Sequence, residues 1–412
     1  MNKADLNKYC KLILEAGVNL YPEQCLVINC GIRNFDFALM LSEAAYAMGA
    51  KYVDIKTDSN FLTKYRIENN RNTEDLEYIP DYIVNRGYEL LVKDFAFVTI
   101  DNLEEIDVLK GTDSDKLGSI TKKAQESNKL VSKALGSSKN AWTIAAVPGP
   151  GWASKVFNSD KNPDKLTDDL WNKLVPVLRL DKKDPVAEWK KHGENLVKRS
   201  SILNEMKIDR LLFEGPGTEL EIGINSNSLW RGGLVKAQNG RIFIPNLPTE
   251  EVFTTPDFKR TNGKVVVTKP VKVMENLLYG IWFEFKDGKV TDFGTDSGRE
   301  ILEKYFSTDE GASYLGEVAL VDINSEVFKS GLIFNSILYD ENAACHIALG
   351  RGFPMCFSNK DDLITPESMI KNGCNNSLVH TDFMIGSEKI NVTGFDKGGS
   401  KTEIIKNGSF CI

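Results

Sequence analysis

The sequence predicts a two-domain protein that combines an open α/β sheet in its N-terminal half with a strand-rich α+β arrangement in its C-terminal half. Its 412 residues exceed the length at which a single hydrophobic core keeps growing. In the first half, strand-like apolar runs alternate with helix-like segments, and in the second half the apolar pattern has a period of two. We therefore expect domains at residues 1–195 and 196–412, with a curved or barrel-like sheet in the second.

The N-terminal half begins with a βαβ pattern. An apolar run at Leu26–Asn29 leads to an amphipathic segment at Phe35–Met48 and then to a second run at Tyr52–Ile55. Helix-compatible segments such as Ser114–Leu135 separate the later strand-like runs. These later runs lie at Leu90–Val92, Ala96–Ile100 and Ala141–Val147. Such an alternation predicts an open α/β sheet.

The last of these runs leads into the turn Pro148-Gly149-Pro150-Gly151. This turn shares only its first two glycines with a dinucleotide-binding fingerprint. A phosphate loop needs glycines where the backbone approaches the ligand and where the helix packs against the sheet. Here prolines intervene and the third glycine is missing, so we interpret the segment as a structural turn and disfavour a dinucleotide-dependent enzyme.

A long helix is predicted between the two halves. Asp184 is a suitable N-cap and Pro185 a suitable first helical residue, and the helical pattern continues to about Met206. The lysines of this segment, together with His192, indicate a solvated helix face. We do not expect His192 to bind a metal.

The second half is rich in predicted strands. Arg210–Glu214 and Glu219–Ile224 flank a Gly-Pro-Gly turn, and Tyr279–Phe285 and Val290–Phe293 flank Asp287-Gly288, so both pairs are expected to form β-hairpins. Further strands are expected at Arg241–Ile244, Lys264–Thr268, Leu378–Met384 and Ile390–Val392, and helices at Gly298–Phe306 and Pro366–Asn372.

The composition excludes several classes of protein. The net charge is −7, and no basic cluster is dense enough to bind a phosphate backbone, so nucleic acid is an unexpected partner. The N-terminus lacks the apolar stretch of a signal peptide, and no apolar run is long enough to cross a membrane. Seven scattered cysteines contain no CxxC pair. These features predict a reduced, cytoplasmic protein.

Two of the three histidines lie in segments dense with carboxylates, at Tyr339–His346 and Ser377–Asp382. In an extended strand, residues two apart project to the same face, which would aim His380 and Asp382 at one point. Together the segments predict a metal site. Cys345 adjoins His346, but no sequence feature marks it as a thiolate, so we interpret it as a packing residue rather than a nucleophile.

Two earlier segments add carboxylates. Glu317 stands alone in the apolar run Leu315–Val321, and a carboxylate in such surroundings is costly unless it is paired or binds a cation. The alternative, equally weighted, is that Gly316 opens a turn that leaves Glu317 exposed. The adjacent Glu250 and Glu251 are less informative, because neighbouring glutamates are usually solvated.

Taken together, the four segments resemble the M29 family of metal-dependent aminopeptidases, and the resemblance spans essentially the whole chain. It is strongest from Asn246 to Gly386, where PTEEVFTTP, GEVALV, ENAACHIALG and NNSLVHTDFMIG stand in the family's order and approximate spacing. The resemblance implies metal ligands at Glu251, Glu317, Glu341, His346, His380 and Asp382.

The activity implied by the resemblance is the release of N-terminal amino acids from small peptides, by a homodimer. Such a ligand set suits two divalent cations per subunit, and zinc, cobalt, manganese and magnesium all accept oxygen and imidazole ligands. We expect Glu317 to bridge the cations and Glu251 to accept the proton of a water that they activate. The sequence does not identify the carboxylate that holds the substrate's amino group.

One position departs from the family's pattern. The family has a tyrosine seven residues after the histidine of the ENAACH-like segment, and this chain has Phe353. If the hydroxyl serves the oxyanion, its loss could cost on the order of 10²–10³ in turnover. Arg351 is an alternative donor. Two alternatives stay open. One is another metal-dependent amide or ester hydrolase, and the other, encouraged by this departure alone, is a catalytically weakened metal-binding homologue.

Overall fold

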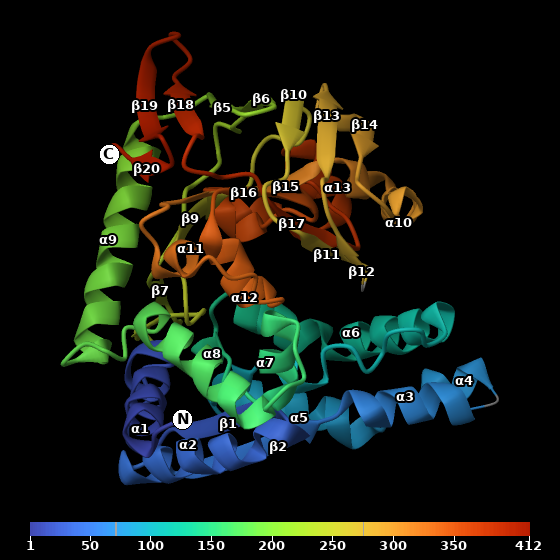
Figure 1. Ribbon diagram of the computed structural model, residues 1–412, viewed down its shortest axis with the longest axis vertical. Helices are drawn as coiled ribbons and strands as arrows, with labels where there is room; N and C mark the ends of the chain where they lie inside the picture. Colours follow the sequence, from blue (N-terminus) through green and yellow to red (C-terminus); the bar gives the residue numbers. More distant parts are fainter. Residues whose placement is uncertain (71, 275) are drawn as a thin grey trace. The chain divides into compact units, whose positions relative to one another are not determined.

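The computed structural model describes residues 1–70, 72–274 and 276–412 (Figure 1). These residues form two compact units, one made of Met1–Lys191 with Leu234–Pro248 and the other of His192–Gly233 with Thr249–Ile412. The domain boundary expected at residue 195 stays a prediction, because compactness does not show which parts fold independently. Within the described residues, no helix has the length and apolarity needed to cross a membrane.

The N-terminal unit is built on a four-stranded sheet in the order β2-β1-β3-β4, and all its strand pairs are parallel. Its strands are β1 (Cys25–Gly31), β2 (Tyr52–Asp58), β3 (Ala96–Ile100) and β4 (Trp142–Ala145). Helix α2 (Phe35–Ala47) connects β1 to β2, as the βαβ pattern predicts. Leu26 and Ile28 are completely buried, and Val27, which points to the opposite face, is also buried, so both faces of the central strand β1 are covered.

Helices make up most of the rest of this unit. They are α1 (Lys3–Leu12), α3 (Asn60–Asn69), α4 (Thr73–Leu76), α5 (Asp81–Val92), α6 (Ser114–Gly136), α7 (Pro150–Phe157) and α8 (Pro163–Val177). The strand expected at Leu90–Val92 is wrong, because these residues end α5. Leu90 and Leu91 pack in a cluster that includes Val131 of α6. A run of three apolar residues cannot distinguish a helix end from a buried strand.

The turn before α7 has a structural role. Glu104 accepts hydrogen bonds from the backbone N–H groups of Gly151 (2.9 Å) and Trp152 (3.2 Å). A Cβ atom on Gly149 would lie 2.5 Å from the Glu104 carboxylate. The position at a helix N-terminus where a phosphate could bind is therefore taken by a side chain of the protein itself.

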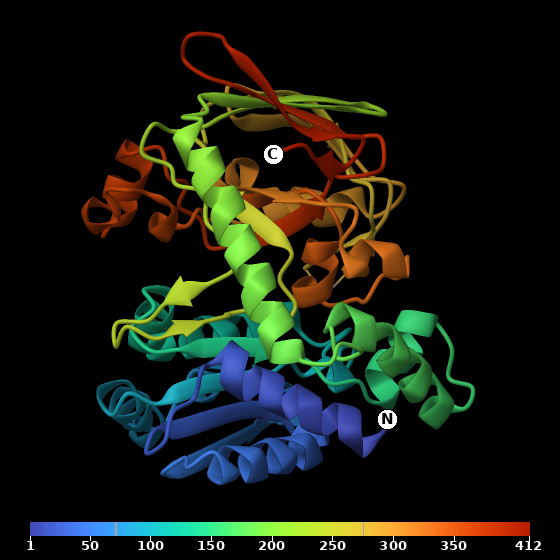
Figure 2. The same ribbon diagram turned by 90° about the vertical axis from the view of Figure 1, so that its left-hand side faces the viewer.

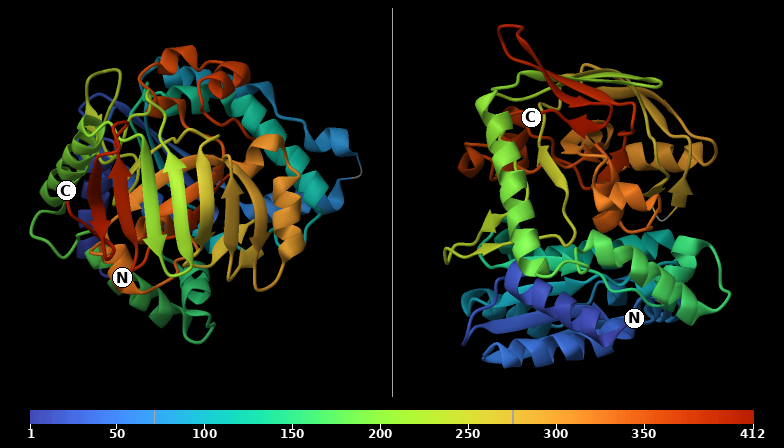
Figure 3. Two further views of the ribbon diagram at one scale, coloured as in Figure 1. Left: turned by 90° about the horizontal axis from the view of Figure 1, so that it is seen from above. Right: turned by 60° about the vertical axis from the view of Figure 1, so that its left-hand side comes forward.

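The C-terminal unit contains an eight-stranded sheet in the order β14-β13-β10-β6-β5-β18-β19-β20, with its strands side by side in Figure 3. The strands are β5 (Arg210–Gly215), β6 (Thr218–Gly223), β10 (Thr261–Val266), β13 (Trp282–Lys286), β14 (Lys289–Gly294), β18 (Asn391–Phe395), β19 (Lys401–Lys406) and β20 (Ser409–Phe410). Both expected hairpins are present, as β5–β6 and β13–β14. The expectation of a barrel-like sheet is wrong, because the described edge strands β14 and β20 do not pair. Period-two alternation reveals one buried face but not whether the edges meet.

A second sheet in this unit has four antiparallel strands in the order β17-β16-β15-β9. They are β9 (Glu251–Thr254), β15 (Leu315–Val321), β16 (His346–Gly350) and β17 (His380–Met384). One face of this sheet joins the core that the eight-stranded sheet also lines. That face contributes Val252, Val318, Leu320, Ile347, Leu349 and Phe383.

Short elements complete the fold. They are β7 (Val235–Lys236) with β8 (Ile242–Phe243), β11 (Val271–Val273) with β12 (Asn276–Leu278), and helices α10 (Arg299–Phe306), α11 (Glu326–Ser330), α12 (Ile337–Asp340) and α13 (Pro366–Lys371). Figure 2 shows α9 (Pro185–Glu205) as one unbroken helix, which confirms the predicted long helix. Leu196 and Leu203 of α9 belong to the core of the C-terminal unit.

Candidate metal centre

Five of the six expected metal-binding residues lie on one face of the four-stranded sheet, opposite its apolar core face. Glu317 is paired across the strands with Ala348, and Ala348 with Asp382. His346 is paired with Ala319. Because side chains alternate along a strand, this register places five residues together. They are Glu251 of β9, Glu317 of β15, His346 of β16, and His380 and Asp382 of β17.

A β-bulge in β15 directs Glu317 to this face. Leu315 is paired with Leu349 and Glu317 with Ala348, so Gly316 is an extra residue in the strand. In a regular strand, Leu315 and Glu317 would share a face. The bulge reverses the alternation, and Leu315 enters the core while Glu317 turns away from it. A Cβ atom on Gly316 would lie 2.3 Å from the carbonyl oxygen of Arg351, which explains the glycine. Glu317 is only 5% exposed, so the exposed turn considered above is wrong.

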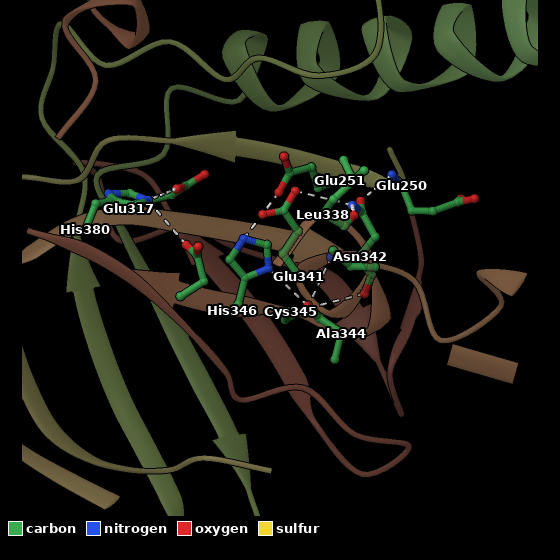
Figure 4. Close-up of polar contacts among 12 residues, drawn as sticks. Glu250, Glu251, Glu317, Leu338, Glu341, Asn342, Ala344, Cys345, His346 and His380 are labelled. Atoms are coloured by element: carbon green, nitrogen blue, oxygen red, sulfur yellow. Dashed lines mark hydrogen bonds and ion pairs between the residues drawn. The ribbon is translucent and has the colours of Figure 1, made fainter. Parts of the chain in front are cut away.

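The side chains form two overlapping groups (Figure 4). Ligand atoms of Glu251, Glu317 and His346 all lie within 4.8 Å of one another, and so do ligand atoms of Glu317, His380 and Asp382. The figure shows His346 with Glu317 and His380 on one side and Glu251 and Glu341 on the other. Glu317 belongs to both groups.

Both imidazoles are oriented by the main chain. His346 Nδ1 lies 3.2 Å from the carbonyl oxygen of Ala344, and His380 Nδ1 lies 2.8 Å from that of Arg351. A carbonyl oxygen only accepts hydrogen bonds, so we assign the proton to Nδ1 in each neutral ring. In the neutral ring each Nε2 atom, which lies near the carboxylates, is then free to bind a cation. This is the arrangement in which metal-binding histidines are usually held.

The buried charges change one another's protonation. Burial raises the pKa of Glu317 to about 7, although His380 acts in the opposite direction. Burial alone would lower the pKa of His346, but the carboxylates around it raise the value to about 10. Asp382 has a lowered pKa because His380 and His346 outweigh the effect of its burial. The raised values mean that the clustered carboxylates favour the uptake of positive charge, as a proton or as a cation.

Two of the buried carboxylate oxygens receive no hydrogen bond from the described residues. Glu251 Oε2 lies 3.2 Å from His346 Nε2, and Asp382 Oδ1 lies 3.3 Å from His380 Nε2. Neither contact has the geometry of a hydrogen bond, and both oxygens are buried without a donor among the described residues. Nor does any described lysine or arginine form an ion pair with these carboxylates. Buried oxygen and imidazole donors clustered in this way fit a divalent cation.

Glu341, the sixth expected ligand, lies outside the sheet in the turn between α12 and β16. Burial and the nearby carboxylates of Glu251 and Asp382 raise its pKa well above the usual range. The amide of Asn342 contacts its Oε1 atom at 3.4 Å. The structure thus brings Glu341 to the same cluster, although its ligand role stays a prediction like those of the other five residues.

Comparison with known proteins places the chain in a family. The model of the thermophilic metalloprotease (M29) family matches residues 2–410. The chain belongs to the M29 peptidase family. Relatives of this M29 peptidase include aminopeptidase 2 of Geobacillus stearothermophilus, which is 36% identical over 98% of this chain and 97% of the relative. Aminopeptidase PepS of Streptococcus thermophilus is 35% identical over 100% of this chain and 98% of its own.

A solved structure extends this likeness to the fold. The wild-type AmpT of Thermus thermophilus superposes on this M29 peptidase with a TM-score of 0.92 and 32% identity, covering 100% of both chains. The whole two-part α/β fold, with its parallel and antiparallel sheets, is therefore shared. The family identifies the chain as a metal-dependent enzyme that hydrolyses peptide bonds, and the residues described above provide suitable donors for the metal.

Of two neighbours of the site in this M29 peptidase, one agrees with the sequence interpretation and the other contradicts it. Cys345 is buried, which raises the pKa of its thiol to about 12 and favours packing over nucleophilic chemistry. His192 does not lie on a solvated face. Its Nε2 atom lies 2.9 Å from the carbonyl oxygen of Thr249 and 3.2 Å from the buried carboxylate of Glu250. The lysine-rich surroundings of His192 in the sequence hid this contact.

Aromatic rings border the cluster. The ring of Phe353 lies against His380 with 4.9 Å between centroids, and Phe253 contacts Phe353 edge-on at 6.0 Å. Phe253 was not singled out from the sequence, although its place two residues after Glu251 in a strand puts both on one face. The residue at which this chain departs from the family's tyrosine is thus beside an expected ligand.

Proposed function

We propose that this M29 peptidase releases N-terminal amino acids from small peptides at a site that holds two divalent cations. The observation that carries the proposal is the position of Glu317. Its carboxylate belongs to both groups of potential ligands, as a carboxylate shared by two cations must. Glu251 and His346 complete one group, and His380 and Asp382 the other, with Glu341 adjoining the first.

Bound divalent cations would supply Lewis-acid activation of the attacking water and polarisation of the scissile carbonyl. The protein's own residues hold and orient these components. The backbone carbonyls of Ala344 and Arg351 fix the two imidazoles, and the apolar core behind the sheet keeps the strands that carry the carboxylates in register. Zinc, cobalt, manganese and magnesium all suit this donor set.

Glu251 is the proposed acceptor of the proton that the attacking water loses. Its Oε2 atom is buried and has no hydrogen-bond donor among the residues that the structure describes, so it can take up a proton without breaking such a bond. We expect Glu251→Gln to abolish turnover while leaving much of the metal bound, since a neutral oxygen still binds weakly. A fully active variant would contradict this role.

The substrate and setting proposed here are small peptides with a free amino terminus, hydrolysed by a homodimer in the cytoplasm. The relatives described above are both aminopeptidases, which supports the choice of substrate. The free cysteines suit a reducing compartment.

The decisive experiment is hydrolysis of leucine p-nitroanilide by the purified protein, after chelation and after separate return of cobalt, zinc, manganese or magnesium. We expect activity to vanish and then return with metal. The same assay on leucine p-nitroanilide with a blocked amino group separates an aminopeptidase from a general amidase. Equal rates on both substrates would contradict the proposal.

A further inference from the structure

Asn342 is a buried amide that contacts two of the segments that form the metal centre. Its Oδ1 atom accepts a hydrogen bond of 2.6 Å from the backbone N–H of Glu250, the residue before β9. Its Nδ2 atom donates to the carbonyl oxygen of Leu338 at 2.9 Å and contacts Glu341 Oε1 at 3.4 Å. Asn342 is completely buried. Figure 4 shows its side chain beside Glu341 and Glu250.

We infer that Asn342 is a positioning residue that fixes Glu341 and Glu251 relative to each other for metal binding. The inference rests on the proposed metal site. Glu251 follows directly on the residue whose N–H Asn342 binds, and Glu341 directly precedes Asn342 in the chain. One side chain therefore links the start of β9 to the turn between α12 and β16.

The chemistry of the amide suits this task. A buried amide needs an acceptor for its N–H groups and a donor for its oxygen, and here both sides are satisfied. The Leu338 carbonyl accepts from the same Nδ2 group that faces Glu341, so the amide cannot rotate without losing a buried hydrogen bond. Contact with Oε1 leaves Glu341 Oε2 available to a cation. Groups that hold ligands in this way typically change metal affinity or activity 10–100-fold.

His192 also contacts the segment that leads into β9, but it does not contact Glu341 and so cannot take over the role of Asn342. His192 approaches the Thr249 carbonyl and the Glu250 side chain, and in Figure 4 the Glu250 carboxylate points away from Glu251. His192 thus contacts the residues that precede β9 but no expected ligand. Asn342 contacts both the backbone of Glu250 and the carboxylate of Glu341.

A matched control lies in the N-terminal unit. Asn140 is also completely buried, and its Nδ2 atom donates to the carbonyl oxygen of Phe95 at 3.1 Å and contacts Asp94 Oδ1 at 3.4 Å. Asn140 therefore serves one carbonyl and one carboxylate, as Asn342 does, but neither group belongs to the metal centre. The match covers the contacts that Nδ2 donates, because Asn140 Oδ1 accepts no hydrogen bond from the described residues. Loss of these donor contacts is expected to act alike at both positions.

The test is a titration of the chelated protein with cobalt(II), followed by its visible absorption, for wild type, Asn342→Ser and Asn140→Ser. We expect Asn342→Ser to weaken cobalt binding about 10–100-fold and its turnover to recover as cobalt is raised. Asn140→Ser is expected to lose thermal stability while binding cobalt as the wild type does. Asn342→Asp, which keeps the acceptor for Glu250 but opposes Glu341 with a carboxylate, should weaken binding further.

Two results would overturn the inference. One is wild-type cobalt affinity in Asn342→Ser, and the other is equal weakening in both serine variants, which would show a structural effect. Circular dichroism establishes that each variant is folded, and the serine change serves if the aspartate variant does not fold. A wild type that binds no cobalt would instead contradict the proposed function itself.

Discussion

The two larger antiparallel sheets of the C-terminal unit share one core but differ in the surroundings of their charged residues. On the eight-stranded sheet, several exposed carboxylates have a cationic partner. Lys264 Nζ lies 3.4 Å from Glu284 Oε1 directly across the strands, and Arg210 Nε lies 3.0 Å from Glu221 Oε2. On the four-stranded sheet, the carboxylates are buried and face one another and two imidazoles.

The exposed charges of the eight-stranded sheet form ion pairs within the protein, whereas the buried carboxylates of the four-stranded sheet are suited to binding a metal. An exposed ion pair is solvated and complete, and it contributes about 0–1 kcal/mol. Several carboxylates buried together are costly unless a cation joins them. The four-stranded sheet therefore needs something that the chain does not supply, and the eight-stranded sheet does not.

The largest expected effect comes from making the same substitution on each sheet. Glu317→Gln removes the carboxylate shared by both ligand groups, so we expect metal binding to fail and activity to fall by more than the roughly 10–100-fold typical of residues that only support ligands. Glu221→Gln, the control, should leave both unchanged. Metal content and leucine p-nitroanilide hydrolysis measure the difference. Comparable losses in both variants would remove the distinction between the sheets.

A second substitution sharpens the comparison by adding a polar group at the site. Phe353→Tyr restores a hydroxyl beside His380, and we expect turnover to rise by up to about 10²–10³ if that hydroxyl donates to the oxyanion. Phe253→Tyr places the same hydroxyl on the neighbouring ring and is expected to give no such gain. No increase for Phe353→Tyr would show that the hydroxyl is not the missing part.

Removal of metal should affect stability only through the four-stranded sheet. A cation present at about 100 times its dissociation constant stabilises the folded state by about 2.7 kcal/mol, because it binds the folded chain alone. We expect chelation to lower the melting temperature of the wild type and of Glu221→Gln equally. The melting temperature of Glu317→Gln should not respond. A response in that variant would mean that the metal binds elsewhere.

The smallest expected effect concerns an ion pair beside the eight-stranded sheet, between the residues that directly precede β5 and β10. Arg260 donates to both oxygens of Asp209, at 2.7 and 3.3 Å, and holds the pKa of that carboxyl below its usual value. A lowered pKa adds stability above the unfolded value of about 3.9, and this stability is lost as the pH falls through the folded value. Asp209→Asn should therefore cost less than about 1 kcal/mol at neutral pH.

Urea unfolding of wild type and Asp209→Asn at about pH 7 and about pH 3 measures this difference. The difference in the free energy of unfolding between the two proteins should be smaller at the lower pH. Since both carry the same metal centre, its own response to acid cancels. A difference in the free energy of unfolding that increases in acid would contradict the expected pH dependence of this ion pair.

Much of the fold could be predicted because local pattern and local structure agree. The βαβ unit, the two hairpins and α9 all follow from periodicity and capping residues. The helical end of α5 and the open edges of the eight-stranded sheet could not be predicted, since both depend on packing between distant segments.

The residues of the site also differ in how far the sequence alone could predict their orientation. His380 and Asp382 are two apart in a strand, so their common direction is a local property. The direction of Glu317 depends on the bulge at Gly316, which is defined only by pairing with β16. Asn342 gave no signal, because a buried amide in the folded protein is one of many asparagines in the sequence.

The main-chain contacts of the two histidines have a consequence for how this chain tolerates mutation. The groups that orient the imidazoles are the carbonyls of residues 344 and 351, and every amino acid carries a carbonyl. Side chains at these two positions can vary over evolutionary time without removing the orienting bond. Glu341 is contacted instead by a side chain, that of Asn342, which a substitution can remove. We therefore expect inactivating mutations to concentrate near Glu341 rather than at residues 344 and 351.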